Sequence, residues 1–329
     1  MTVAPSTVLN PGRVDAAKAR RARVIGILAT HGSIIAFVIW VLFLCFATTT
    51  FASVDNIMIV LRQAAIFSIV AIGTTMVMLL GELDISFGSA LAIGGVSGAS
   101  VLVAGGGLLL AVTAAVAAGL AFGAVNAVLI TVLRIPSVVA TLATLGAGAG
   151  VALLFTRGTT IYGEGLTEVS FITQGFVAGV PVPVIISVVL YAVAWYVLTY
   201  TRWGAHLYAT GDSAQAAFRA GIDVTRMRVT AFLAAGALAG FAGLLLASRV
   251  GRASADMGAD ALFPVLTAVI LGGVSIDGGR GRIINTFIAC VFLASITNGL
   301  ILLGVDSTVQ QIVQGAVLVL AVSLDRLRR

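Results

Sequence analysis

Charge is scarce in this sequence. Asp, Glu, Lys and Arg make up only 10% of its 329 residues, whereas 60% of the residues are hydrophobic. Soluble domains carry about 25% charged residues and could not cover so much apolar surface with polar groups. The composition therefore excludes a soluble globular fold. It predicts an all-α polytopic membrane protein whose outer surface lies in lipid.

Chemically active residues are also few. Lys18 is the only lysine, so the chain has no P-loop motif G-x-x-x-x-G-K-[ST]. The motifs H-E-x-x-H and G-x-S-x-G are absent, and His31 and His206 stand alone. Cys45 and Cys290 lie in apolar runs, which favours buried thiols over a disulfide or a metal site. We therefore expect no catalytic residue, no cofactor and no metal in this chain.

The formal net charge of +6 could indicate nucleic-acid binding, but the sequence has no basic groove motif and almost no interleaved aromatic residues. We therefore expect no nucleic-acid partner. The basic residues instead indicate which loops face the cytoplasm. Residues 1–23 form a polar, basic tail. The apolar run that follows is too long for the core of a signal peptide, so we expect it to remain as the first span.

Charged residues mark the points at which the chain leaves the bilayer, because a charge at its centre costs about 2.5–3.5 kcal/mol. A spanning helix needs about 20 apolar residues. One uncharged interval, 85–133, is too long for a single span, and the glycines of "AGGGL" at 104–108 would break it. The sequence thus predicts ten crossings in a transmembrane domain of residues 24–325, followed by a basic C-terminus, 326–329. The uncharged intervals are 24–54, 63–81, 85–133, 135–156, 169–201, 229–248, 261–276, 283–305 and 307–324.

The positions of the basic residues predict the orientation, since Lys and Arg accumulate in cytoplasmic loops. With ten spans and a cytoplasmic N-terminus, only Arg62, Arg157, Arg249 and Arg252 fall outside. All other basic residues then lie on the cytoplasmic side. The sequence therefore predicts that both ends of the chain are cytoplasmic.

Two carboxylates interrupt the apolar pattern in "MVMLLGELDISFGSALAIGG", residues 76–95. Glu82 and Asp84 are two residues apart and would point to different faces of a helix. They lie either in an ordinary solvated turn or in a helix break recessed inside the protein, where irregular backbone needs protein partners or a wet cavity. In such a break, Asp84 or Ser86 would cap the helix that starts near Phe87.

A segment with related chemistry is "AVILGGVSIDGGRGRI", residues 268–283, which joins an apolar run to glycines and Asp277. The preceding run is short and starts near Pro264, so this helix is expected to be partial or tilted. Two glycine-interrupted segments, one in each half of the chain, suggest a duplicated transporter architecture.

The longest polar segment after the N-terminal tail is "TRWGAHLYATGDSAQAAFRAGIDVTRMR", residues 201–228. Asp212 and Ser213 are good N-cap residues, "SAQAAFRA" favours a short helix, and Gly221 would end it. The segment is either a solvated connector or a docking helix for a cytoplasmic partner, and the caps and the aromatic residue favour docking. The side chains presented to the cytoplasm would be Gln215, Phe218 and Arg219.

Five segments, in this order along the chain, resemble the permease subunits of bacterial ABC importers for monosaccharides, the ribose, xylose and galactose group. They are "LLGELDISFGSALAIGG", "RIPSVVATLATLGAGAG", "WGAHLYATGDSAQAAFRAGI", "LGGVSIDGGRGRI" and "TNGLILLGV…QQIVQGAVLVLAV". The resemblance extends from about residue 50 to the C-terminus. It implies the ten-helix type II importer fold in the bacterial cytoplasmic (inner) membrane. It also implies a pore formed by two permease copies, usually a homodimer.

The same resemblance implies partners and coupling residues. Two cytoplasmic ABC ATPase domains, which bind ATP and Mg²⁺, would lie below the pore, and an extracytoplasmic sugar-binding protein would dock above it. Segment 203–223 matches the coupling helix that inserts into a groove of the ATPase. "GADALFPVLTAVILGG" departs from the family pattern at Phe263 and Pro264. The identity of the substrate is therefore not inferred from the resemblance. The coupling residues expected here are Gly211, Asp212, Gln215, Phe218, Arg219 and Gly221.

A permease of this kind needs a sparsely polar pathway and little bond chemistry. Asp84, Ser86, Asn126, Thr141, Thr144 and Asn298 are the candidate lining residues, although each could equally bond one helix to another. Glu82 and Asp84 could instead brace a kink about which the pore gates. ATP binding by the partner would move the 203–223 segments together and open the pore outward, and hydrolysis would reset it.

Two alternatives belong to other classes. The first is a proton-coupled secondary transporter with Glu82 or Asp84 as the proton site. The second is an intramembrane enzyme that acts on a lipid-linked sugar.

Overall fold

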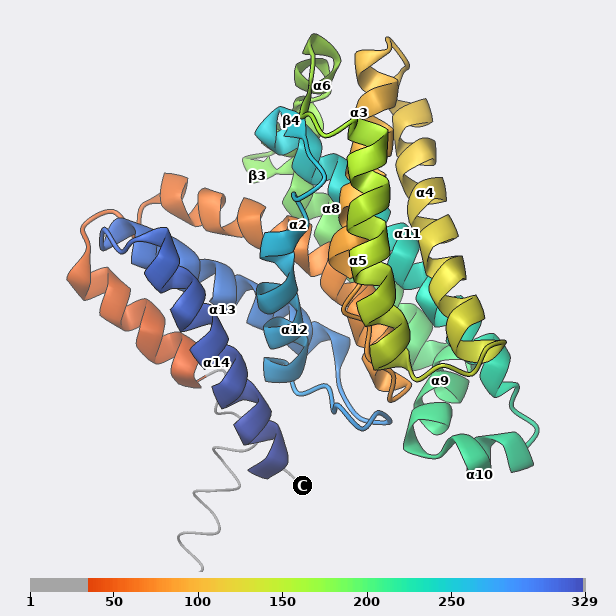
Figure 1. Ribbon diagram of the computed structural model, residues 1–329. Coiled ribbons are helices and arrows are strands. Elements are labelled where there is room, and N and C mark those ends of the chain that lie inside the picture. The colour runs from red at the N-terminus through yellow and green to blue at the C-terminus, as the bar shows by residue number, and fades with distance from the viewer. Residues whose placement is uncertain (1–34, 328–329) are drawn as a thin grey trace, which may run out of the picture.

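The computed structural model describes residues 35–327 (Figure 1). The predicted basic tail, the start of the first span and the last two residues lie outside this range. An apolar helix at Ile35–Ala47 comes first. The elements that follow are α2 (Val54–Leu79), α3 (Phe87–Val103), α4 (Leu108–Thr131), α5 (Ser137–Thr156), β1 (Ile161–Tyr162), α6 (Glu164–Glu168), α7 (Phe171–Gln174), β2 (Phe176–Val177), β3 (Val180–Pro181), α8 (Val182–Tyr200), α9 (Arg202–Asp212), α10 (Ala214–Arg219), α11 (Val224–Val250), β4 (Arg252–Ala253), the 3₁₀ turn η1 (Ala259–Ala261), α12 (Leu262–Leu271), α13 (Ile283–Leu302) and α14 (Ser307–Leu327).

Six of the described helices, α2, α4, α5, α8, α11 and α13, are long and apolar enough to cross a membrane. Four further apolar helices are shorter: Ile35–Ala47, Phe87–Val103, Ala259–Leu271 and Ser307–Ser323. The long uncharged interval divides where the glycines predict, because α3 ends at Val103, α4 begins at Leu108, and Gly105 between them has a φ of 80°. A multi-pass helical membrane fold is confirmed, and the count of ten crossings stays a prediction.

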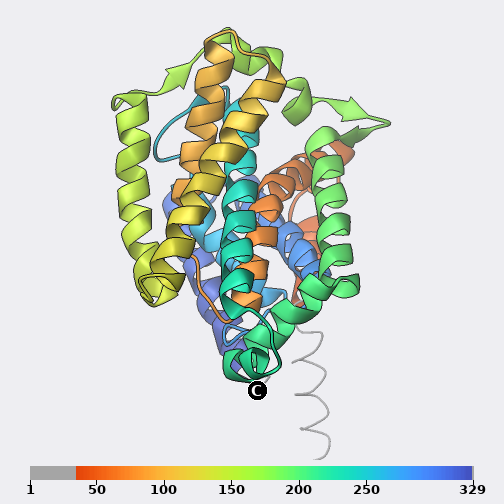
Figure 2. The same cartoon turned by 90° about the vertical axis from the view of Figure 1, so that its right-hand side faces the viewer.

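Helix α11 lies at the centre of the bundle, against α2, α3 and α4 (Figure 2). These helices touch through their backbones. A Cβ atom on Gly94 of α3 or on Gly119 of α4 would overlap the backbone of α11 at Gly240 or Gly236. Lipid tails are as apolar as leucine, so membrane helices associate through close packing of small residues rather than through the hydrophobic effect. The glycines therefore hold the bundle together.

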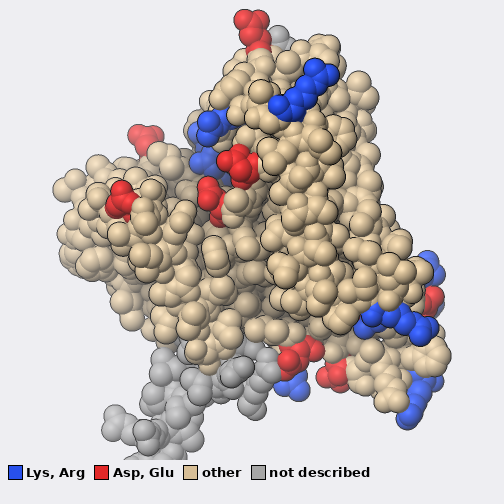
Figure 3. Space-filling model, viewed as in Figure 1, with Lys and Arg blue, Asp and Glu red and all other residues tan. Residues whose placement is uncertain are grey.

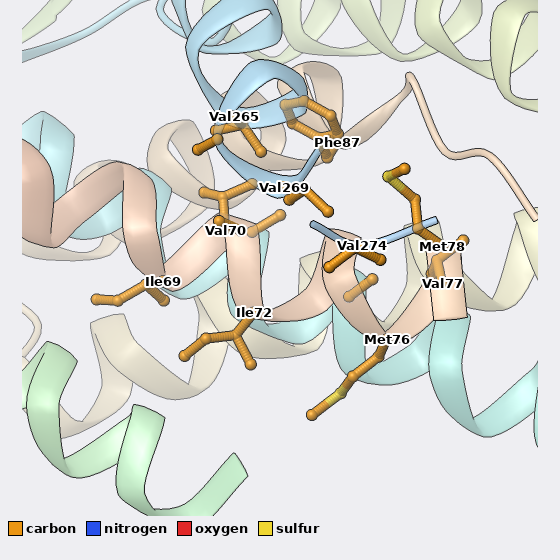
Figure 4. Packing of buried hydrophobic residues seen from close by; sticks show 14 of the residues in the cluster. Ile69, Val70, Ile72, Met76, Val77, Met78, Phe87, Val265, Val269 and Val274 are labelled. Carbon is orange, nitrogen blue, oxygen red and sulfur yellow. The ribbon is translucent and has the colours of Figure 1, made fainter. Parts of the chain in front are cut away.

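Larger side chains fill the space where α2, α3 and α12 meet. Figure 4 shows Val265 and Val269 of α12 beside Val70 of α2 and Phe87 of α3. All four side chains are at most 2% exposed. This packing fixes α12 against the centre of the molecule.

Helix α12 is only half the length of a span. Its 10 residues extend about 15 Å, against a hydrocarbon core of about 30 Å. It is entered from the irregular segment 254–258 and the turn η1. Pro264 occupies its first turn, where backbone N–H groups have no partner within the helix. The partial helix predicted near Pro264 is therefore present.

Short elements and charged side chains gather at two ends of the molecule. The β1–β4 and β2–β3 pairs and α6 lie at one end, and α9 and α10 lie at the other (Figure 1). On the face shown in Figure 3, the column of helices between these ends has an uncharged surface. Such a band fits the hydrocarbon layer of a bilayer.

Gly119→Ala is expected to lower the thermal stability. Its methyl group would overlap the carbonyl of Gly236, and overpacking costs about 1–3 kcal/mol, more than the gain of about 1 kcal/mol for alanine over glycine in a helix. Gly315→Ala in α14 is the matched control, because no atom lies within 4 Å of its new methyl group. Thermal unfolding of the two purified variants in detergent measures the difference, and equal melting temperatures would contradict this packing.

Candidate functional site

The segment 80–86 between α2 and α3 is a helix break that contains Glu82, Asp84 and Ser86. Asp84 is buried, with 4% of its surface exposed. Its Oδ1 accepts two hydrogen bonds from Ser86, one from the backbone N–H at 2.8 Å and one from the hydroxyl at 2.6 Å. The structure therefore places Asp84 inside the protein rather than in a solvated turn.

Ser86 continues this contact into a chain of hydrogen bonds across three helices. Its hydroxyl accepts from Nδ2 of Asn126 on α4 at 2.7 Å, and Oδ1 of Asn126 accepts from the hydroxyl of Thr144 on α5 at 2.6 Å. Asp84, Ser86, Asn126 and Thr144, here named the polar chain, are each at most 6% exposed. Because each member bonds its neighbour, the polar chain bridges α3, α4 and α5.

One detail of the expected cap is wrong. Ser86 occupies the N-cap position of α3, but its side chain makes no capping hydrogen bond. Its hydroxyl donates to Asp84 instead. Asp84 in turn binds the backbone N–H of Ser86, not one in the first turn of the helix.

Helix α5 holds the other side of the break through Thr141, which is fully buried. The Thr141 hydroxyl lies 3.3 Å from the carbonyl of Leu83 and 2.8 Å from that of Ser137, and it can donate to either. The N–H of Leu83 donates to Oγ of Ser137 at 3.2 Å. Helix α5 thus supplies partners for both backbone polar groups of Leu83, as irregular backbone inside a membrane protein requires.

Glu82 leaves the break in a different direction and pairs with Arg228 near the start of α11. The two charged atoms, Oε1 and Nε, are 2.7 Å apart, and the side chains are 11% and 33% exposed, respectively. The contact is an ion pair without the alignment of a hydrogen bond, since Nε of Arg228 has no hydrogen-bond acceptor among the described residues. The pair ties the break to α11.

Asn298 lies apart from the polar chain, on α13. Its amide exchanges two hydrogen bonds with Asn56 on α2, at 2.8 and 3.0 Å, and both residues are 6% exposed. An amide pair of this kind bonds one membrane helix to another. The structure therefore does not bring Asn298 together with the other candidate lining residues.

The polar segment 201–228 contains two helices, α9 and α10, where the sequence predicted one. Ser213 caps α10 by accepting from the N–H of Ala216 at 3.2 Å, whereas Asp212 is the last residue of α9 and not a cap. Gly221, with a φ of 82°, follows the end of α10. The side chains of Gln215, Phe218 and Arg219 are exposed.

Four glycines, Gly81, Gly211, Gly278 and Gly279, join α9 to the helix break and to the loop 272–282; we name them the glycine junction. The N–H of Gly279 donates to the carbonyl of Leu79 at 2.9 Å. A Cβ atom on Gly211 would overlap that carbonyl and lie 2.6 Å from the nitrogen of Gly279. A Cβ atom on Gly278 would lie 2.8 Å from Cα of Gly81. Three chain segments thus meet with no side chain between them.

Two adjoining hollows surround the irregular segment before α12. The larger, of about 620 Å³, lies between α3, α5 and this segment, and its polar lining includes Ser89 and Thr156. The smaller, of about 210 Å³, shares Ser254 and Asp256 with it and extends to Asp260. Irregular backbone is tolerated in a membrane protein when it borders a water-filled space, so these hollows are the candidate solute pathway.

None of the expected lining residues borders either hollow. Their polar lining includes Ser254, Asp256 and Asp260, which the sequence reasoning did not single out. One signal could have found them: the polar run 252–260 precedes an uncharged interval, 261–276, that is too short for a full span. A hydrogen bond from Ser254 lowers the pKa of Asp256, so this carboxylate is charged at neutral pH.

The fold and these sites define a multi-pass membrane protein in which a packed bundle borders a cavity with several polar groups in its lining. Residues 56–322 match the family model described as "Branched-chain amino acid transport system / permease component". The chain belongs to this family of permeases.

Similar curated proteins narrow the resemblance. The ribose import permease protein of Escherichia coli (strain K12) is 35% identical over 302 residues, covering 91% of this chain and 94% of that protein. The ribose import permease protein of Bacillus subtilis (strain 168) is 36% identical over 303 residues, covering 92% and 94%. The D-allose transport system permease protein of Escherichia coli (strain K12) is 32% identical over 278 residues, covering 84% and 85%. No solved structure matches the chain.

The resemblance to permease subunits of monosaccharide ABC importers is thereby confirmed, as is a multi-pass protein of the inner membrane. The relatives are named as permease proteins.

Substitutions of Asp84 separate a structural role from a transport role. Asparagine keeps an oxygen that can accept from Ser86, whereas alanine leaves buried donors unpaired at a cost of about 1–3 kcal/mol. We expect Asp84→Asn to keep nearly wild-type melting temperature and solute uptake, and Asp84→Ala to lose several degrees. The melting temperature of each variant is measured on the purified protein, and its solute uptake is measured in proteoliposomes. An Asp84→Asn protein that is stable but inactive would show that the carboxylate itself acts in transport.

Proposed function

We propose that this chain is the permease subunit of an ATP-driven ABC importer and forms the pathway for a monosaccharide or a similar small polar solute. An extracytoplasmic binding protein would deliver the solute. A cytoplasmic ATPase, which binds ATP and Mg²⁺, would supply the energy. The names of the ribose and allose relatives support the solute class. The glycine junction carries the coupling part of the proposal, because it joins α9, the helix directly before the exposed α10, to the helix break.

The proposed arrangement has ten spans, both chain ends in the cytoplasm, and two identical permease copies around the pathway. In this orientation α9 and α10 face the cytoplasm, and the β1–β4 pair faces the binding protein. The distribution of arginine supports the orientation, since only Arg62, Arg157, Arg249 and Arg252 fall outside.

The coupling step would begin at α10, where Phe218 is 73% exposed beside Arg219. A partner that binds these side chains more tightly in one state shifts the permease toward that state. Movement of α9 would pass through Gly211 to the end of α2 and to the loop 272–282, which leads out of α12. Because α3 and α12 border the larger hollow, the same movement would change its access.

A proton-coupled secondary transporter is the alternative. It requires a carboxylate that can exchange protons with the pathway. Asp84 is instead bonded to Ser86, and Glu82 is paired with Arg228. Neither borders the hollows, which favours the ATP-driven importer.

Reconstitution of the chain with its ATPase and binding protein in liposomes tests the proposal. We expect sugar uptake to require ATP and the binding protein, and to persist when an uncoupler removes the proton gradient. Uptake that is lost with the uncoupler, or that proceeds without the ATPase, would support the secondary transporter instead.

Gly211→Ala is expected to uncouple hydrolysis from transport. The methyl group would push α9 away from Leu79 and Gly279, so that a push on α10 would no longer reach the break. We expect sugar uptake per ATP hydrolysed to fall at least severalfold, while the ATPase still binds. Gly107→Ala, which has open space around the new methyl group, is the control. A wild-type ratio of uptake to hydrolysis in Gly211→Ala would refute the role of the junction.

A further inference from the structure

A third hollow lies between α2, α12, α13 and α14 and has a volume of about 280 Å³. It shares Phe67 and Asp260 with the 210 Å³ hollow described above, so the two adjoin. Its size is close to the lower end of small-molecule sites, roughly 300–1,000 Å³. We name it the amide hollow because its polar lining is rich in glutamine. The polar lining includes Gln63, Asp260, Thr297, Gln310, Gln311 and Gln314.

Much of the hydrogen-bonding capacity of this lining is unused. In the described part of the chain, the side chains of Gln63, Asp260 and Gln311 form no hydrogen bond. Nε2 of Gln310 donates to the carbonyl of Val305 at 2.9 Å, and Nε2 of Gln314 donates to the hydroxyl of Thr297 at 3.4 Å. The carbonyl oxygens of these two amides remain able to accept a hydrogen bond from a molecule in the hollow.

The composition of the hollow selects a chemical class. A glutamine amide both donates and accepts, which matches hydroxyl groups that do the same. Phe67, Leu293 and Pro264 supply apolar surface for the C–H faces of a sugar ring. The lining contains a carboxylate and no lysine or arginine, so it disfavours an anionic solute. A neutral molecule with several hydroxyl groups fits this lining.

We propose that the amide hollow is a low-affinity binding site for a neutral polyhydroxylated solute of monosaccharide size. This proposal rests on the proposed transport function and names a place on the solute's route. Gln63 on α2 and Gln311 on α14 bind hydroxyl groups of the solute, and Asp260, which also borders the 210 Å³ hollow, accepts a further hydrogen bond from it. The hollow adjoins the 210 Å³ hollow, and weak binding would let the solute be released toward it.

Saturation-transfer NMR on the purified permease–ATPase complex, without binding protein, tests this site with ribose as the probe. We expect transfer to ribose at millimolar concentration and none to ribose 5-phosphate. Gln63→Leu and Gln311→Leu remove hydrogen-bonding groups while keeping side-chain size, and each is expected to weaken ribose binding about tenfold. Gln174→Leu is the matched control, because this exposed glutamine of α7 does not border the hollow.

The outcomes separate the site from the transport function. Ribose transfer that is absent in the wild type, equal in Gln63→Leu and Gln311→Leu, or equal for ribose 5-phosphate would overturn the site. The melting temperatures of both variants show whether they are folded, and Asp260→Asn gives a second, nearly isosteric variant. Uptake by wild-type proteoliposomes tests the transport function independently. ATP-dependent uptake with no binding at the hollow would refute the site alone.

Discussion

Irregular backbone inside a membrane protein must find hydrogen-bonding partners within the protein or in trapped water, because hydrocarbon supplies none. This chain meets the requirement in two opposite ways. Segment 80–86 is closed: Asp84 binds Ser86, Thr141 and Ser137 bind Leu83, and the polar chain continues to α4 and α5. The segment before α12 is open and borders hollows whose polar groups have room for water or solute. The first segment fixes the start of α3, and the second borders the hollows proposed as the solute pathway.

Close approach of backbones serves both the packing of the bundle and its proposed movement. The sequence has 38 glycines, and those on α3, α4 and α11 let three helices touch without side chains between them. In the glycine junction, backbones also touch without side chains between them, but the segments in contact are α9, the helix break and the loop 272–282 rather than parallel helices. Contacts between backbones leave little slack, since protein interiors are densely packed. A displacement of α9 therefore cannot be absorbed by a side-chain rotation before it reaches the end of α2.

The sequence was sufficient for the features that depend on local chemistry. Uncharged intervals and glycines predicted the boundary between α3 and α4, and Pro264 predicted the half-length helix. It could not predict which polar side chains meet, because that depends on how each helix is rotated about its axis. In the sequence, Asn126 and Asn298 are both polar residues within apolar runs. In the structure, Asn126 belongs to the polar chain, whereas Asn298 pairs with Asn56. Two adjacent cap candidates, Asp212 and Ser213, likewise left the start of α10 undecided by one residue.

The lining of the amide hollow also bears on the difference between the family description, which names branched-chain amino acids, and the relatives, which are named for sugars. An amino acid carries a carboxylate, whose charge is costly to remove from water without a cationic partner. The amide hollow offers no lysine or arginine, and its own carboxylate, Asp260, would repel that of an amino acid. Amides and one carboxylate suit hydroxyl groups better than a zwitterion, so the hollow favours the solutes for which the relatives are named.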